Sequence, residues 1–308
     1  MPDVILKHVP GMATATPVPS FEADALSESA FMREYISQSR PCVIRGAVRH
    51  WPASKKWRDR EYLKSLCHHQ VTYLPHENHV SMKRTEVGMR TVPFGEAVDL
   101  IYSAQIAAFG TGAPSKLETD LGGFSFLTKG DPGFLYPAIR SFFFRNAGSS
   151  WHYHPFDETL MCQVREPKKV GLLNVRNPLH QHIRRIFLKE DYYEDPFAFE
   201  GIVSADLQWF SASLETGDAL YIPPLWWHGV IATSNEVGVT IPVVWRSPNH
   251  VMVDSIRKMA AGEADLIGPI NPIQRQNLFD FARNTGVVRE LTAAWQRGET
   301  ERLIVAPK

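Results

Sequence analysis

The sequence predicts a mostly β protein with flanking helices, in which short strands form a sandwich or barrel. Three observations support this fold class. Residues 142–245 contain a dense series of short runs with strand character, separated by turns. Segments of helical period lie before and after this region. The chain has 308 residues and is 44% hydrophobic, enough for a sizeable core. Many short strands in such a chain are typical of sandwiched or closed sheets.

The N-terminal part alternates between helical and strand patterns. Residues 1–20 hold four prolines and no clear period, so we expect a loose lead-in. The patterns that follow predict helices over 21–39, 58–66 and 92 to about 108, and strands over 40–46 and 70–74. Residues 110–123 are rich in Gly, Ser, Thr and Asp, and we expect a loop there that could lie over the site.

The predicted β core begins with an aromatic run, Ile139 to Arg145, which we expect to form a buried strand. Its expected strands are 142–146, 151–154, 159–165, 169–175, 202–203, 208–214, 218–223, 227–232 and 237–245. Residues 178–200 interrupt the series as a loop or short helices. Residues 251–267 and 272–297 have helical period and predict a C-terminal helical extension, which could cover the core or mediate a homodimer.

Composition limits the kinds of partner. Lys+Arg and Asp+Glu both number 33, so no global field attracts nucleic acid or an anionic membrane. No apolar run has membrane-spanning length, and the N-terminus lacks the layout of a signal peptide. Cys42, Cys67 and Cys162 are too few and too scattered for a disulfide framework. These absences favour a cytoplasmic protein without a membrane partner, and the zero net charge gives no strong sign of a nucleic-acid partner.

Three histidines from two distant stretches predict a metal site. His152 and His154 lie in the stretch Trp151–Glu158, and His228 ends the stretch Gly217–His228. Alternate residues of a strand share a face, so His152 and His154 would project together, roughly 6–7 Å apart. An imidazole from another strand would complete the set and leave coordination positions open. Neutral imidazole suits Fe, Mn, Cu, Ni or Zn.

The same stretches carry a resemblance to a known family. Gly217–His228, with the pattern Gly-Asp-x-Leu-x-Ile-Pro-x-x-Trp-Trp-His, resembles the second ligand motif of the JmjC-type, cupin-fold Fe(II)/2-oxoglutarate oxygenases. Arg40–Gly46 with Trp51-Pro52 and Trp57 resembles their N-terminal segment. Leu160–Val170 resembles the strand that follows the first ligands. The group includes the factor-inhibiting-HIF asparaginyl hydroxylase and the tRNA wybutosine hydroxylase.

The resemblance spans roughly residues 20–245 and implies a domain layout. It implies a double-stranded β-helix, the cupin or jelly-roll barrel, with N-terminal α/β elements. We expect a catalytic domain over 21–248 with its barrel core at about 139–246, and the helical extension over 249–308.

The first ligand motif departs from the family pattern. The family has His-x-Asp, whereas this chain has His152-Tyr153-His154. Glu158 gives the layout H-x-H-x-x-x-E, which is similar to the wider cupin superfamily, where three histidines and a glutamate hold Mn, Fe, Cu or Ni. Two ligand sets therefore remain open, the three histidines alone or the three with Glu158. A bulge could also bring Asp157 inward.

The resemblance also implies a site for the cosubstrate. In the family, a lysine on the strand after the first motif pairs with the distal carboxylate of 2-oxoglutarate, and the motif match makes this residue Lys168. A lysine is chemically apt, because its long stem carries a point charge into the barrel. Ser149 and Thr240 fall where the family places polar contacts to the cosubstrate.

The implied function is that of a metal-dependent oxygenase, an Fe(II)/2-oxoglutarate-dependent hydroxylase of an unidentified protein, RNA or small molecule. One alternative is a three-histidine cupin metalloenzyme, with or without Glu158, that does not use 2-oxoglutarate. Another is a non-catalytic JmjC-like binding module. Replacing the aspartate by His154 removes a negative charge from the metal ligands and bears on whether 2-oxoglutarate is used. Dependence on 2-oxoglutarate therefore distinguishes the first hypothesis from the other two.

Overall fold

A computed structural model describes residues 14–75, 90–112, 115–127, 140–152, 154, 157–174, 208–224 and 226–246. Several predicted features lie outside the described residues: the segment 178–200, the strand 202–203, and the helical extension over 249–308 with its proposed role in a homodimer.

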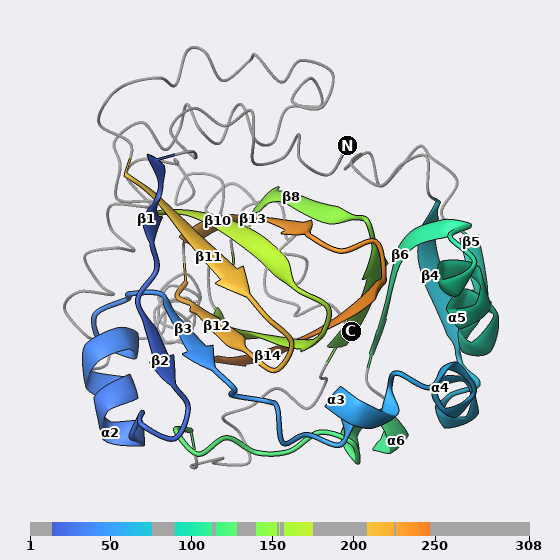
Figure 1. Ribbon diagram of the computed structural model, residues 1–308, viewed down its shortest axis with the longest axis horizontal. Helices are drawn as coiled ribbons and strands as arrows, with labels where there is room; N and C mark the ends of the chain where they lie inside the picture. Colours follow the sequence, from blue (N-terminus) through green and yellow to red (C-terminus); the bar gives the residue numbers. More distant parts are fainter. Residues whose placement is uncertain are drawn as a thin grey trace, which may run out of the picture.

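The described chain is mostly β and forms two sheets (Figure 1). The five-stranded sheet has the order β1 (Thr16–Pro17), β11 (Trp209–Leu214), β10 (Lys168–Asn174), β13 (Trp226–Ala232), β8 (Gly148–His152). The nine-stranded sheet has the order β2 (Ser20–Glu22), β3 (Cys42–Arg45), β12 (Ala219–Ile222), β9 (Asp157–Arg165), β14 (Val237–Arg246), β7 (Arg140–Arg145), β6 (Ile106–Gly112), β4 (Gln70–Pro75), β5 (Arg90–Pro93).

This arrangement confirms the predicted fold class, a mostly β jelly roll with flanking helices. The pairings are antiparallel except for β1 with β11 and β2 with β3. Among the described strands the sheets do not close into a barrel, because each sheet keeps two edge strands. The fold is therefore a jelly-roll sandwich.

Short helices accompany the nine-stranded sheet. They are α2 (Glu28–Phe31), the π-helical turn η2 (Met32–Ile36), α3 (Ala53–Lys56), α4 (Arg60–Leu66), α5 (Phe94–Tyr102) and α6 (Ser115–Glu118). Figure 1 shows α4 and α5 beside β4, β5 and β6, and α2 at the opposite end beside β2. The oxygen of Ser27 accepts from the amide of Ala30 at 3.2 Å and caps α2, and Asp59 caps α4 in the same way.

The core consists of two apolar layers, one on each face of the nine-stranded sheet. One layer lies between the sheets and includes Met161 of β9, Leu172 of β10 and Val230 of β13. The other lies under the helices and includes Leu160 and Cys162 of β9. Burying a side chain of this size contributes about 1.5–3 kcal/mol. Because strand residues alternate between faces, β9 directs Met161 between the sheets and its neighbours toward the helices.

Two segments before the β core differ from the sequence-based expectation, and a third, the loop over 110–123, differs as well. Part of the predicted lead-in is ordered, because Thr16–Pro17 pairs with β11 and Ser20–Glu22 pairs with β3. The helix predicted to run to about 108 ends at Tyr102, and residues 106–112 form β6 between β4 and β7. A short apolar run fits either periodicity, and pairing with two neighbouring strands selects the strand here.

The predicted loop over 110–123 is in its described part a strand end and a short helix. Its described part contains the end of β6, α6 and Asp120, which lies against α3 and α4. Asp120 is 1% exposed and accepts hydrogen bonds from Lys56 at 2.9 Å, from the indole of Trp57 at 2.9 Å and from the hydroxyl of Tyr62 at 2.7 Å. Burial alone would raise the pKa of Asp120, but these three bonds together hold it below its ordinary value.

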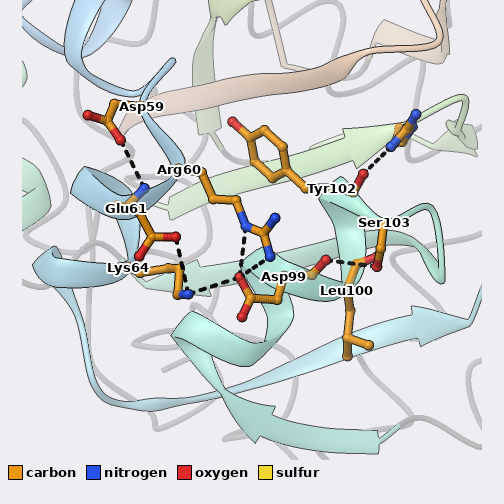
Figure 2. Close-up of polar contacts among 9 residues, drawn as sticks. Asp59, Arg60, Glu61, Lys64, Asp99, Leu100, Tyr102 and Ser103 are labelled. Atoms are coloured by element: carbon orange, nitrogen blue, oxygen red, sulfur yellow. Dashed lines mark hydrogen bonds and ion pairs between the residues drawn. The ribbon is translucent and has the colours of Figure 1, made fainter.

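A second carboxylate joins α4 to α5 at the surface. Figure 2 shows Asp99 of α5 facing Arg60 and Lys64 of α4, with the nearest Arg60 nitrogen at 2.6 Å and the Lys64 nitrogen at 3.2 Å. The side chain of Asp99 is 40% exposed, so water already solvates its charge. Ion pairs of this kind contribute little to stability.

These two carboxylates give a matched test of burial. We expect Asp120→Ala to lower the free energy of unfolding by about 2–4 kcal/mol, because it leaves a buried indole N–H and a hydroxyl without their acceptor. Asp99→Ala should cost about 1 kcal/mol or less. Urea denaturation of the full chain measures both losses, and equal losses would contradict the assigned role of Asp120.

Candidate metal and carboxylate-binding site

The turn before β12 connects the second predicted motif to the fold. Gly217 has a φ of +97°, a conformation that favours glycine, and its amide donates to the carbonyl of Gln163 at 2.7 Å. The carboxylate of Asp218 accepts from the guanidinium of Arg45 at 2.6 Å and from the amide of Gly46 at 3.0 Å. Gly217 and Asp218 therefore hold β12 against β3 and β9. Their role in the motif is to fix this turn, not to contact a ligand.

His228 lies on β13 and is fully buried. It belongs to the face of β13 that points between the sheets, because Trp226 and Val230 of the same face pack in that apolar layer. The Nδ1 atom of His228 lies 3.1 Å from the carbonyl oxygen of Trp226. A carbonyl can only accept, so Nδ1 carries the proton and the neutral ring has its lone pair on Nε2. This tautomer suits a metal ligand.

His154 lies next to His228. The two ring centroids are 5.1 Å apart and the planes meet at 88°. The Nδ1 atom of His154 is 2.9 Å from the hydroxyl of Thr159 on β9, which fixes the ring from the opposite sheet. The strand ends at His152, so His154 reaches this position from beyond β8 and not, as predicted, as the alternate residue of one strand.

His152 is placed by its backbone. Its Cα is the register partner of His228 in the antiparallel pair β8–β13. Paired positions in such a ladder lie on the same face of the sheet. The side chain of His152 lies outside the described part of the chain, and among the described side chains no group of three His, Cys, Asp or Glu is arranged to hold a metal.

Glu158 contacts a tyrosine in the layer under the helices. It is 1% exposed and accepts a hydrogen bond of 2.6 Å from the hydroxyl of Tyr221 on β12. Tyr221 packs with Leu160 and Cys162 in the layer under the helices. Glu158 has the same strand parity as Leu160 and Cys162, so it faces that layer and not the space between the sheets. Burial, with the neighbouring Glu158 carboxylate, raises the pKa of Tyr221 well above its ordinary value. The side chain of Asp157 lies outside the described residues.

Lys168 is a buried cation between the sheets. It is 3% exposed, and its ammonium donates to the hydroxyl of Thr240 at 2.5 Å and lies 5.5 Å from the ring centre of Phe144. Among the described residues it forms no ion pair. Burial lowers the pKa of Lys168 to about 7, because the charged form loses its hydration. A buried ammonium that faces a neutral oxygen is suited to receive an anion.

The structure brings Thr240 and Lys168 together and adds a residue without a predicted role. The hydroxyl of Thr240 donates to the side-chain oxygen of Gln163 at 2.8 Å, and Gln163 is fully buried. Gln163 lies in the predicted motif Leu160–Val170, but buried amides are common and no sequence signal distinguished it. Ser149, the third predicted cosubstrate contact, is half-buried on β8 opposite Val230.

A cavity of about 520 Å³ lies beside the strand that carries His228. Trp226 lines it, together with Phe210 and the segment 38–41. The indole of Trp226 donates to the carbonyl of Ser39 at 3.1 Å, and Ser39 has a φ of +51°. A space large enough for a small molecule or one side chain of a larger substrate therefore lies two residues from His228 on β13.

Comparison with known proteins supports the same group. A family described as a cupin-like domain matches residues 28–104, a segment that precedes all three histidines. The lysine-specific demethylase JMJ32 of Arabidopsis thaliana is 38% identical over 68 residues, which cover 22% of this chain and 19% of that protein. The Jumonji C domain-containing protein 5 of Drosophila melanogaster is 24% identical over 249 residues, 72% of this chain and 59% of that protein. The chain is therefore similar to JmjC and cupin-like proteins.

The human tRNA wybutosine-synthesizing protein 5 is also similar to this chain, with 28% identity over 96 residues, which cover 31% of this chain and 30% of that protein. Each of these three alignments spans less than two thirds of the relative's own length. In the part of the chain that the structure describes, no helix is long and apolar enough to cross a membrane.

The burial of Lys168 should be visible in the pH dependence of stability. Between pH 7 and 10.5 the unfolded chain holds a proton on Lys168 that the folded chain has released, so the free energy of unfolding rises with pH. The slope from one such group is at most about 1.4 kcal/mol per pH unit. Lys168→Met should remove this contribution. Its free energy of unfolding should therefore exceed that of the wild type most at pH 7 and below. Urea denaturation from pH 6 to 9.5 tests this, and a pH-independent difference would contradict it.

Proposed function

We propose that this protein is an Fe(II)- and 2-oxoglutarate-dependent hydroxylase. The single observation that carries the proposal is Lys168, a buried ammonium between the sheets with a hydroxyl for its partner and no ion pair among the described residues. A dicarboxylate that reaches Lys168 with one end would supply the missing charge. The family-level resemblance to JmjC proteins supports an oxidoreductase of this type.

The proposed metal ligands are His152, His154 and His228. The donor chemistry fits, because the two described rings lie side by side and the carbonyl of Trp226 fixes the tautomer of His228 with its lone pair on Nε2. Fe(II) bound there would supply the redox chemistry with O2 and 2-oxoglutarate that hydroxylates a C–H bond. The chain's own contribution is to orient the imidazoles and to exclude water with Trp226, Leu172 and Val230.

The positions of His228 on β13 and Lys168 on β10 agree with a cosubstrate that reaches from the histidines to Lys168. The register pairs His228 with Leu172, four residues from Lys168 on β10, or about 13 Å along the strand. The side chain of Lys168 shortens the distance between its ammonium and the histidines. A five-carbon dicarboxylate could then contact the metal with one end and Lys168 with the other. Thr240 would hold the ammonium in place, and Ser149 on β8 is the proposed further polar contact.

One observation favours a second candidate function. The first motif has His154 in place of the family aspartate, and the structure places this imidazole against His228. An all-imidazole site carries no ligand charge, as in cupin metalloenzymes that do not use 2-oxoglutarate and hold Mn, Cu, Ni or Zn. The contact of Glu158 with Tyr221 under the helices supports the three histidines without Glu158 as the ligand set in both candidates.

Metal content tests the ligand set. His154→Ala and His228→Ala should each lose most of the Fe(II) that the wild type binds, because two imidazoles hold a first-row ion far less tightly than three. His50→Ala, at an exposed histidine that contacts the carbonyl of Gly123, should bind as the wild type does. Elemental analysis after anaerobic loading gives the stoichiometry, and full metal content in His154→Ala would exclude that ligand.

Cosubstrate binding tests the carboxylate site. Lys168→Met should weaken 2-oxoglutarate binding at least about 30-fold, because the distal carboxylate is then buried without a countercharge. Lys169→Met, at the exposed neighbour, is the matched control and should bind as the wild type does. Calorimetry measures the affinity, and succinate release with Fe(II) and O2 measures turnover.

The outcomes separate the hypotheses. Binding and succinate release that depend on Lys168 support the hydroxylase, whose substrate class is a protein, an RNA or a small molecule. Bound metal without 2-oxoglutarate binding or turnover would favour the three-histidine metalloenzyme. A wild-type chain that binds neither metal nor 2-oxoglutarate would point to a non-catalytic binding module.

A further inference from the structure

The amide of Gln163 has a fixed direction. Its nitrogen donates to the carbonyl of Arg165 at 2.6 Å and to the carbonyl of Glu166 at 2.5 Å. Both partners can only accept, so the NH2 group lies on that side and the oxygen on the other. The two N–H groups of this buried side chain are thus both used, and its oxygen is the acceptor for Thr240.

The direction of the amide determines the direction of the Thr240 hydroxyl. The oxygen of Gln163 carries no hydrogen, so in the 2.8 Å contact Thr240 is the donor. A hydroxyl has one hydrogen, and with that hydrogen directed to Gln163 the lone pairs of Thr240 remain for Lys168. The hydrogen bonds therefore run in one direction, from Lys168 to Thr240 to Gln163 and on to two backbone carbonyls.

Gln163 also holds the turn that delivers Lys168 to the site. Glu166 and Pro167 connect Arg165, the last residue of β9, to β10, and Glu166 has a φ of +57°. The amide of Gln163 bonds two of the carbonyls in this turn, and Lys168 is the first residue of β10 after it. The backbone of Gln163 is fixed in turn by Asp218, whose carbonyl accepts from its amide at 2.8 Å.

We propose that Gln163 is a positioning residue that acts through Thr240 to keep the ammonium of Lys168 bonded to a neutral acceptor and available to a carboxylate. This inference rests on the proposed function for the identity of the ligand. A carboxylate at position 163 would compensate the charge of Lys168. The amide of Gln163 instead orients the ammonium through Thr240 and leaves its charge uncompensated. The arrangement therefore selects for an anionic group at this end of the site.

The described surroundings of Lys168 contain few other charges. Thr240 contacts it from β14 and Phe144 from β7, Gln163 of β9 lies behind Thr240, and the register partners of Lys168 are Leu214 on β11 and Ala232 on β13. Cys162 is the titratable group that acts on Lys168, and burial raises the pKa of its thiol far above the ordinary value, so it stays neutral. Protonation of Lys168 therefore depends on burial and on the direction of Thr240.

The test is a double-mutant cycle on the full-length protein. Gln163→Met removes the acceptor, so the Thr240 hydroxyl can donate to the neutral amine of Lys168 and stabilise it. We expect the titration midpoint of Lys168, followed by the NMR signal of its ¹³C-labelled ε carbon, to fall by about one pH unit. Thr240→Val should lower it too, and Thr240→Ser should match the wild type. In the Thr240→Val background, Gln163→Met should cause no further change, because Gln163 acts through the hydroxyl.

Glutarate, a dicarboxylate without the 2-oxo group, gives the binding readout. At pH 7.5 its affinity should fall about tenfold in Gln163→Met, because only the protonated fraction of Lys168 binds. A folded Gln163→Met protein with an unchanged midpoint, or effects of the two substitutions that add, would overturn the inference. If Gln163→Met does not fold, equal midpoints for Thr240→Val and Thr240→Ser would overturn it.

The two proposals fail differently. A wild-type chain that binds neither glutarate nor 2-oxoglutarate at any pH would refute the cosubstrate assignment. The NMR titration of Lys168 needs no ligand and would still decide whether Gln163 and Thr240 govern its protonation.

Discussion

The arrangement of the site depends on a constraint of strand geometry, the alternation of side chains along β9. Thr159 and Gln163 face the space between the sheets, where they contact His154 and Thr240. Glu158 and Leu160 face the helices. One strand therefore supplies both the polar contacts of the site and the apolar support behind it. The same alternation separates Glu158 from the imidazoles, although it is only four residues from His154 in sequence.

The second physical determinant is the burial of one positive charge. An ammonium in an apolar interior loses several kcal/mol of hydration, and Lys168 recovers part of it from Thr240 and the ring of Phe144. The chain could avoid this loss with a carboxylate partner, but the described residues around Lys168 offer a hydroxyl backed by an amide. Among the described residues this charge has no ion pair, and this observation is the basis for the proposed anionic ligand.

Much of the fold could be predicted from periodicity. The predicted strands 159–165, 208–214 and 237–245 lie within one or two residues of β9, β11 and β14, because β-branched or aromatic residues mark each of them. The expectations failed where local pattern is ambiguous. Residues 106–108 suit a helix or a strand, and only the pairing with β4 and β7 decides. Ser20–Glu22 has almost no local signal, and its strand exists because β3 provides a partner.

By itself, the sequence determined which residue types are available for the site: three histidines in two distant motifs, a lysine after the first motif and a threonine on the last strand. Residue type and spacing carry that information, because they identify chemistry and strand parity. The tertiary structure alone decided which of them share a space. It brought His154 to His228 from beyond the end of β8, turned Glu158 toward Tyr221, and joined Gln163 to Thr240 and Lys168. These contacts link strands that are far apart in sequence, and their geometry follows from sheet register, which no local pattern encodes.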